Sequence, residues 1–276
     1  MIQPIHLLLL LLISSNVAAQ SPISAGEKHT LHSKILGEVR EVWIALPENY
    51  DANRKYPVIY ALDAEWQFDI TRSLARELTT YDKIPHHIVV GVPHIDTRHR
   101  LKDLTFTTTE VSSDGKPDPG MASFFNAETS GGGMPFYEHL KSEILPFVDS
   151  LYSTNGFDVL IGHSLGGYFG AYIMTLNSPF EAYQLFDPSI WYNHGNAIQH
   201  FSETLPKACK ANVFIASAAG GRNREQYNLD THQEFQAALV KNGINAQHKS
   251  YAEEGHLSVR LPALIDGLTQ LYKGYS

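Results

Sequence analysis

The chain has 276 residues, of which 43% are hydrophobic and 18% charged, so it can bury a sizeable core and is expected to fold. Its formal net charge of -8, with no run of basic residues, argues against binding to a nucleic-acid backbone. The length fits one large domain.

The first nineteen residues have the features of a secretory signal peptide. Leu7–Ile13 is an uninterrupted apolar run that is too short to span a bilayer. Small residues at 17–19 precede an expected cleavage point at Gln20, although the amino-terminal region carries no Lys or Arg. We therefore expect a mature domain over residues 20–276 that is periplasmic or secreted and makes no stable membrane insertion after cleavage. An uncleaved anchor is the alternative.

Short apolar runs alternate with stretches of helical periodicity along the rest of the chain. Strands are predicted at residues 28–40 with a turn at 37, and at 41–46, 57–62, 87–92, 158–161, 183–186, 213–216 and 247–251. Helices are predicted at 70–79, 136–152, 167–177, 229–242 and 262–272. Strands that are apolar at consecutive positions are typical of parallel sheets, which are buried on both faces. This order predicts an α/β fold with a mostly parallel central sheet of about eight strands and helices on both faces.

Residues 105–135 show neither the periodicity of a helix nor that of a strand. They are rich in Thr, Ser, Gly and Asp and contain three consecutive glycines at 131–133. A loop of this length inside a compact domain is usually functional, so a lid or a binding loop is predicted here. An ordinary surface insertion is the alternative.

The segment FDVLIGHSLGGYFG, residues 157–170, contains a G-x-S-x-G match centred on Ser164. A predicted buried strand leads into the match and a predicted helix follows it, which is the setting of a nucleophile elbow. Side chains at Gly162 and Gly166 would collide with the neighbouring strand and helix. The helix start places the N–H of Leu165 where it can stabilise an oxyanion. A strand–helix turn without chemistry is the alternative.

A serine hydroxyl becomes a good nucleophile only when a base takes its proton. The α/β-hydrolase fold, which such an elbow indicates, places the base late in the chain, after the acid. His256 lies in the sequence EEGH, between the last predicted strand and the last predicted helix. Gly255 allows this loop to turn, so His256 is the predicted base.

The acid has three candidates. Glu225 is favoured, because it lies in the loop directly after the strand NVFIASA. Asp230 lies just beyond it and is expected to cap the next helix, and Asp187 follows the preceding strand. A second oxyanion donor is expected after the strand PVIYAL, at the N–H of Ala64 or Glu65.

In this order the motifs resemble the branch of the α/β-hydrolases that includes esterase D and the enterochelin-esterase-like enzymes. The matching stretches are YPVIYALD, HIVVGVP, FDVLIGHSLGGYFGAY, DPSIWY and EEGHLSV, within residues 42–271. The resemblance implies ester hydrolysis by a Ser–acid–His mechanism, with no metal and no organic cofactor.

Two positions depart from the pattern of these relatives, which often have Gly in place of Ala64 and Ser in place of Asp187. The second change could alter the acyl or alcohol pocket near Trp191, which is predicted to contact substrate. Arg100 lies in a segment that is near the pocket in relatives, so it is predicted to bind an anionic substrate group. A structural ion pair between Arg100 and Asp103 is the alternative.

The predicted function is hydrolysis of a small-molecule carboxylic ester. A short-chain carboxylesterase, a siderophore trilactone esterase and an acyltransferase that uses the same triad all remain open. A non-catalytic binding protein is disfavoured because both Ser164 and His256 are present. The sequence does not indicate the oligomeric state.

Overall fold

The computed structural model describes residues 25–176, 178–204, 210–220 and 223–274. The predicted signal peptide lies outside the described residues. Within these ranges no helix is long and apolar enough to cross a membrane.

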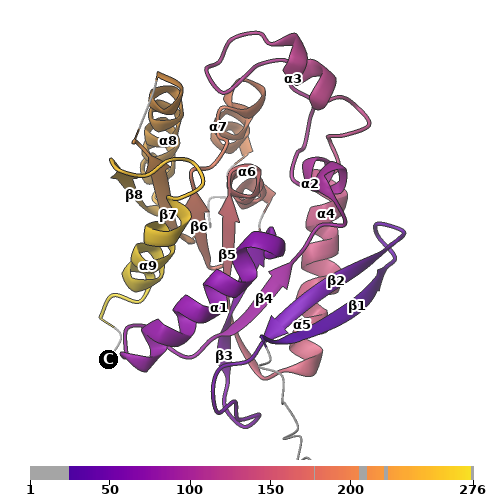
Figure 1. Ribbon diagram of the computed structural model, residues 1–276, viewed down its shortest axis with the longest axis vertical. Helices are drawn as coiled ribbons and strands as arrows, with labels where there is room; N and C mark the ends of the chain where they lie inside the picture. The colour runs from indigo at the N-terminus through magenta and orange to yellow at the C-terminus, as the bar shows by residue number, and fades with distance from the viewer. Residues whose placement is uncertain (1–24, 177, 205–209, 221–222, 275–276) are drawn as a thin grey trace, which may run out of the picture.

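The described residues contain one sheet of eight strands in the order β1-β2-β4-β3-β5-β6-β7-β8 (Figure 1). The strands β1 and β2 form an antiparallel hairpin, β2 pairs antiparallel with β4, and the remaining pairs are parallel. Their bounds are β1 (Glu27–Ser33), β2 (Glu38–Ala45), β3 (Tyr56–Leu62), β4 (Ile88–Val92), β5 (Thr154–His163), β6 (Ala182–Phe186), β7 (Asn212–Ala218) and β8 (Asn245–Tyr251).

Helices cover both faces of this sheet. They are α1 (Ala64–Thr80), α2 (Thr97–Asp103), α3 (Pro119–Phe124), α4 (Gly133–His139), α5 (Leu145–Leu151), α6 (Leu165–Ile173), α7 (Tyr192–Thr204), α8 (Asn223–Lys241) and α9 (Arg260–Leu271). A π-helical turn, η1 (Leu140–Ile144), joins α4 to α5, and a short 3₁₀ turn, η2 (Met174–Leu176), follows α6. The helices α1 and α9 pack on one face, and α4 to α8 pack on the other (Figure 1).

The central strands are apolar at consecutive positions because they contribute to two cores. In β3, Tyr60 and Leu62 pack with the α4–α8 layer, whereas Ile59 packs with α1 and α9. In β5, Leu160 faces the first layer and Ile161 the second. The predicted α/β fold is therefore confirmed. The strands predicted at 28–40 and 41–46 together form the hairpin β1–β2, and α2, α3 and α7 have no counterpart among the predicted helices.

Residues 105–135 lie beyond the carboxyl ends of the parallel strands, where α3 is drawn in Figure 1. The Phe106 ring stacks on Tyr172, with 3.7 Å between the ring centroids. The Tyr192 hydroxyl donates to the carbonyl of Thr107 at 2.9 Å. These contacts hold the start of the segment against α6 and α7, and its role as a lid or binding loop stays a prediction.

Candidate active site

Ser164 stands between β5 and α6 in a strained turn. Its backbone angles, φ 58° and ψ -119°, are rare for a residue with a side chain, as a nucleophile elbow requires. A Cβ atom at Gly162 would overlap the backbone of Gly166, so the turn can close this tightly only around glycine. A Cβ at Gly166 would lie 3.3 Å from Oδ2 of Asp63, which is a tight contact rather than a collision. The elbow therefore packs directly against the turn that follows β3.

His256 lies on the segment between β8 and α9 and is placed by the residue before the nucleophile. Nε2 of His163 donates to the carbonyl oxygen of His256 at 2.6 Å, and the two rings lie 4.5 Å apart between centroids. Burial, followed by the charge of His256, lowers the pKa of His163 to about 3, so His163 is neutral and can act as this donor. The His256 side chain is 42% exposed, which leaves it open to solvent and substrate.

The acid beside His256 is Asp187, which follows β6. Its Oδ2 atom lies 2.6 Å from Nδ1 of His256, and its Oδ1 atom accepts from the N–H of Ala218 at 3.0 Å. Burial alone would raise the pKa of Asp187, but the hydrogen bond from His256, the charges of His232 and His256 and the N–H of Ala218 together outweigh it, so the pKa is lowered. The carboxylate therefore takes the proton-bearing Nδ1 as its donor, which leaves Nε2 of His256 as an acceptor.

This contact corrects the favoured prediction of Glu225. The nitrogen that Glu225 was expected to hold is occupied by Asp187, and the Glu225 side chain lies outside the described residues. The expected loop is largely helical, because α8 begins at Asn223. Asp230 is exposed inside α8 and accepts from Gln226 at 2.8 Å, so its predicted capping role is also wrong. The available signal was an Asp at the carboxyl end of a buried strand, one strand earlier than expected.

Two helices begin at the edge of the sheet where Ser164 lies. The first N–H groups of a helix have no partner within it, and α6 begins with Leu165. In α1 the N–H groups of Trp66 and Gln67 bond to the carbonyl of Asp63 at 2.9 and 3.0 Å. Among the described residues this leaves the N–H groups of Ala64 and Glu65 available. Because β3 and β5 are neighbouring parallel strands, the predicted donors Ala64 and Leu165 follow strand ends on the same edge.

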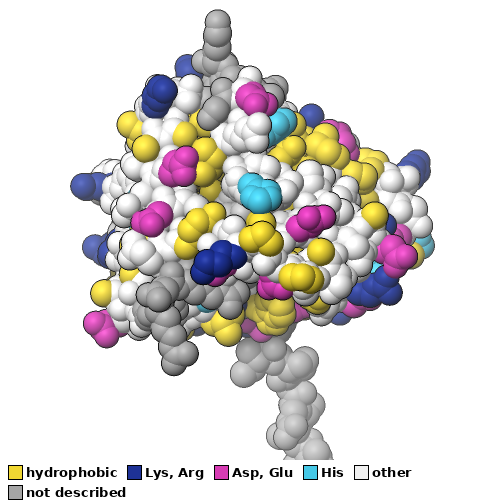
Figure 2. All heavy atoms as spheres, turned by 90° about the horizontal axis from the view of Figure 1, so that it is seen from above, with side chains coloured by type: hydrophobic (Ala, Val, Ile, Leu, Met, Phe, Trp, Pro, Cys, Tyr) yellow, Lys and Arg dark blue, Asp and Glu magenta, His cyan; other side chains and the backbone are white. Residues whose placement is uncertain are grey.

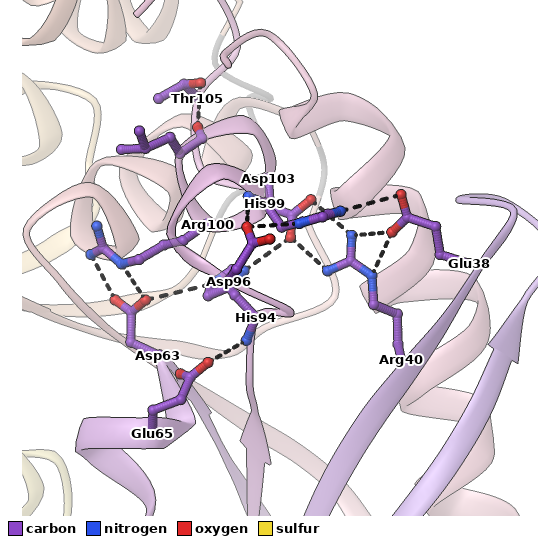
Figure 3. A network of polar contacts seen from close by, with 11 residues as sticks. Glu38, Arg40, Asp63, Glu65, His94, Asp96, His99, Arg100, Asp103 and Thr105 are labelled. Carbon is purple, nitrogen blue, oxygen red and sulfur yellow. Dashed lines mark hydrogen bonds and ion pairs between the residues drawn. The ribbon is translucent and has the colours of Figure 1, made fainter. Parts of the chain in front are cut away.

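Arg100 is engaged by the turn after β3 (Figure 3). Its Nε and Nη2 atoms lie 2.6 and 2.9 Å from the two carboxylate oxygens of Asp63. The alternative pairing with Asp103 is wrong, because Asp103 instead accepts from Arg40 and contacts His94. The Arg100 side chain is only 14% exposed, so its prediction as a substrate ligand gains no support from the geometry.

Trp191 lies in the hydrophobic core and is 7% exposed. It packs at an angle against Tyr192, with 6.0 Å between ring centroids, and its carbonyl accepts from the N–H of Gly195. These contacts indicate a packing role, and substrate contact by Trp191 stays a prediction.

A second set of Ser, carboxylate and His side chains lies away from the elbow. Ser33 donates to Oε2 of Glu143 at 2.6 Å, and Nδ1 of His139 contacts the same oxygen at 2.6 Å. The serine and the histidine thus meet the carboxylate rather than each other, so His139 has no serine proton to accept. This network ties the end of β1 to η1 and has the geometry of a structural clamp.

Together, the mostly parallel sheet, the elbow at Ser164 and the His256–Asp187 pair define a serine hydrolase of the α/β-hydrolase class. Residues 33–181 match the family described as "Putative esterase", and the chain belongs to this family of ester hydrolases.

Known relatives agree with this classification. The chain is 27% identical over 263 residues to the ferri-bacillibactin esterase BesA of Bacillus subtilis (strain 168), covering 88% of each chain. An IroE-like serine hydrolase from Shewanella oneidensis has a similar structure, with a TM-score of 0.77, 32% identity and coverage of 90% of this chain and 80% of the other. The siderophore hydrolase EstB from Aspergillus nidulans shares the fold, with a TM-score of 0.75, 18% identity and coverage of 91% and 96%.

Proposed function

We propose that Ser164, His256 and Asp187 form a catalytic triad that hydrolyses carboxylic esters through an acyl-enzyme. The observation that carries the proposal is the 2.6 Å contact between Asp187 and Nδ1 of His256, on the same edge of the sheet as the strained Ser164. It fixes the imidazole in the tautomer whose Nε2 can accept a proton.

In the acylation step, Oγ of Ser164 attacks the ester carbonyl while its proton passes to Nε2 of His256. The N–H groups of Leu165 and Ala64 are the donors that we propose for the resulting oxyanion. The C–O bond of the ester then breaks, and the alcohol leaves with the proton from His256. Water attacks the acyl-enzyme by the reverse proton path, releasing the acid and regenerating Ser164. Asp187 stabilises the imidazolium that forms in each half-reaction.

Oγ of Ser164 lies 3.4 Å from Oγ of Ser189 in this structure. Catalytic hydrogen bonds are often long or misaligned before substrate binds. We expect Oγ of Ser164 to form its hydrogen bond to Nε2 of His256 in the ester complex, with Ser189 as a neighbouring hydroxyl beside the nucleophile.

The substrate we favour is a siderophore ester. This rests on two similar proteins, a ferri-bacillibactin esterase and, at the level of fold, a siderophore hydrolase. The surroundings of the site suit a bulky ligand with apolar parts, because three hydrophobic side chains there are exposed. Trp66 and Ile95 come shortly after the ends of β3 and β4, and Leu257 comes directly after the proposed base. Figure 2 looks onto this end of the molecule and shows hydrophobic and histidine side chains among scattered charges.

The test is hydrolysis of ferri-bacillibactin and ferri-enterobactin by the mature protein, with products identified by mass spectrometry. A p-nitrophenyl acetate assay runs beside it, and Ser164→Ala serves as the inactive control. The proposal would be supported if the wild-type protein cleaves the siderophores and p-nitrophenyl acetate and Ser164→Ala cleaves none of them. Hydrolysis of the simple ester alone would support a short-chain carboxylesterase, and transfer of the acyl group to an added alcohol in place of water would support an acyltransferase.

We also propose that this reaction takes place outside the cytoplasm. Support comes from the apolar run and small residues within the first nineteen positions.

A further inference from the structure

The residue before Ala64 has an unusual backbone. Asp63 has φ 55° and ψ 48°, the left-handed conformation that residues with a Cβ seldom adopt. It directly precedes α1, so its angles set the direction of the Ala64 N–H. A strained conformation persists only where the surrounding structure determines it.

The Asp63 side chain is held from two sides. Both carboxylate oxygens accept from Arg100 of α2, at 2.6 and 2.9 Å, and Oδ1 lies 3.4 Å from Nε2 of His94. Asp63 itself is 1% exposed. Its Oδ2 atom also faces the first turn of α6, since a Cβ at Gly166 would lie 3.3 Å away. One buried carboxylate therefore belongs to the segment that supplies one proposed oxyanion donor and lies close to the helix that supplies the other.

Behind Asp63 the charges continue in alternating sign (Figure 3). His94 lies between Asp63 and Asp103, with Nδ1 2.9 Å from Oδ2 of Asp103. Arg40 of β2 then grips Asp103 with two bonds of 2.7 and 3.1 Å. We refer to Arg40, Asp63, His94, Arg100 and Asp103 as the buried charge network.

Fold stability alone is a weak reason for such a network, because removing charges from water costs more than packing apolar side chains of the same size. A network of fully paired charges instead gives its members one defined geometry. Here that geometry ends at the turn before Ala64, beside the nucleophile elbow.

Given the proposed ester hydrolysis, we propose that Arg100 is a positioning residue: through Asp63 it holds the left-handed turn that aims the Ala64 N–H at the acyl oxygen, with protonated His94 bracing the same carboxylate. The oxyanion exists only in the transition state and the tetrahedral intermediate. Loosening the turn therefore lowers kcat far more than it changes KM.

The charge on His94 makes the positioning of the Asp63 turn dependent on pH. Burial opposes it, but the hydrogen bonds and charges of Asp103 and Asp63 raise the pKa of His94 to about 9. The His94 ring contacts Asp63 and Asp103, its backbone N–H donates to Glu65, and the Phe136 ring packs against it. Arg100 and Arg40 pair with the same two aspartates (Figure 3). Above this pKa the two carboxylates lose the cation between them, so the turn loosens as the pH rises.

The test compares Arg100→Lys and Arg100→Gln with the wild-type protein on p-nitrophenyl acetate. Lysine keeps the charge but not the two-point grip on Asp63. We expect kcat to fall about tenfold in Arg100→Lys and about 100-fold in Arg100→Gln, with KM changed by less than about threefold. The affinity for a trifluoromethyl ketone, which binds as a tetrahedral oxyanion adduct, should fall in parallel.

The matched control is Asp266→Asn. Asp266 is also held by two side chains, Lys249 and Tyr251, but it lies on α9 and outside the buried charge network. This variant should lower the melting temperature and leave kcat and ketone affinity unchanged. A folded Arg100→Gln with wild-type kcat and ketone affinity would overturn the proposal.

The wild-type protein supplies a test that needs no variant. Its kcat, corrected for spontaneous hydrolysis, should decline above pH 9 while circular dichroism stays constant. A flat kcat from pH 7 to about 10.5 would contradict the role of His94. If the wild-type protein is an esterase but the Arg100 variants and the pH profile do not behave as expected, only the positioning role is wrong and the proposed function stands. If wild type lacks esterase activity, or Ser164→Ala keeps it, the proposed function itself is wrong.

Discussion

Asp187 and His256 lie 69 positions apart in the chain and 2.6 Å apart in the structure, between Oδ2 of the one and Nδ1 of the other. Asp187 has a positive φ of 41°, and its N–H bonds to the carbonyl of Ala216 at 2.7 Å. The neighbouring strand β7 therefore holds the acid in place on both its backbone and its side chain.

This pairing makes Asp187→Asn the most informative acid variant. Asparagine preserves the shape but favours the wrong imidazole tautomer, so kcat on an activated ester should fall about 10⁴-fold. Steady-state kinetics with thermal melts measure this effect. The controls are Glu225→Gln and Asp230→Asn, which should keep kcat within about twofold. If Asp187→Asn is active and Glu225→Gln is inactive, the acid of the triad is Glu225 of α8 and not Asp187.

The nucleophile is tested by Ser164→Ala. Alanine keeps the Cβ atom and the strained backbone but removes the hydroxyl, so turnover of an activated ester should drop by about 10³ or more. The melting temperature should stay close to that of the wild type. Labelling by a fluorophosphonate probe should disappear in this variant. Persistent labelling would identify another serine as the nucleophile, and Ser33→Ala is the variant to examine next.

Buried histidines should make the fold sensitive to mild acid. Burial lowers the pKa of His87 and His163 to about 3 and that of His232 to about 4. In the unfolded chain each takes up a proton below its ordinary pKa of about 6.5. The unfolded state then binds more protons than the folded state. As the pH is lowered, the free energy of unfolding therefore decreases by about 1 kcal/mol per pH unit for each histidine.

One group opposes this trend. Burial and the charge of Glu181 raise the pKa of Asp158 to about 7, so the folded state gains a proton there as the pH falls. For the three histidines and Asp158 together, the net loss between pH 6.5 and 4.5 should correspond to about two protons, and His139 and His248, whose pKa burial also lowers, add to it. Urea unfolding across this range measures it. His87→Gln, far from the elbow and next to Tyr272, should reduce the pH slope without changing kcat. An unchanged slope would show that His87 titrates normally.

Export is tested by the mature amino terminus. Since the apolar run ends before the small residues at 17–19, we expect processing at or near Gln20 when the protein is made with its full sequence in a bacterial host. Mass spectrometry of the fractionated protein gives the terminus. Ala19→Arg should block cleavage, because signal peptidase sites need small residues at that position. A soluble cytoplasmic pool that keeps Met1 would contradict export.

Local features of this protein are determined by its sequence. The stretches PVIYAL and VLI are apolar at consecutive positions, which is typical of a strand buried on both faces, and β3 and β5 are such strands. The elbow at Ser164 is equally local, because Gly162 and Gly166 act within four residues of each other on one strand–turn–helix unit. The fold class and the position of the strained serine follow from such patterns, which extend over only a few consecutive residues.

The partners of long-range contacts were decided by the tertiary structure. Sequence order allowed Glu225, Asp230 or Asp187 to meet His256, and the pairing of β6 with β7 brings Asp187 there. Arg100 could equally pair with Asp103, one helical turn away, but Arg40 of β2 occupies that carboxylate. Arg100 instead reaches Asp63, 37 residues away. Many carboxylates can satisfy one cation, so the choice among them depends on which strand ends the sheet brings together, and no local pattern encodes that.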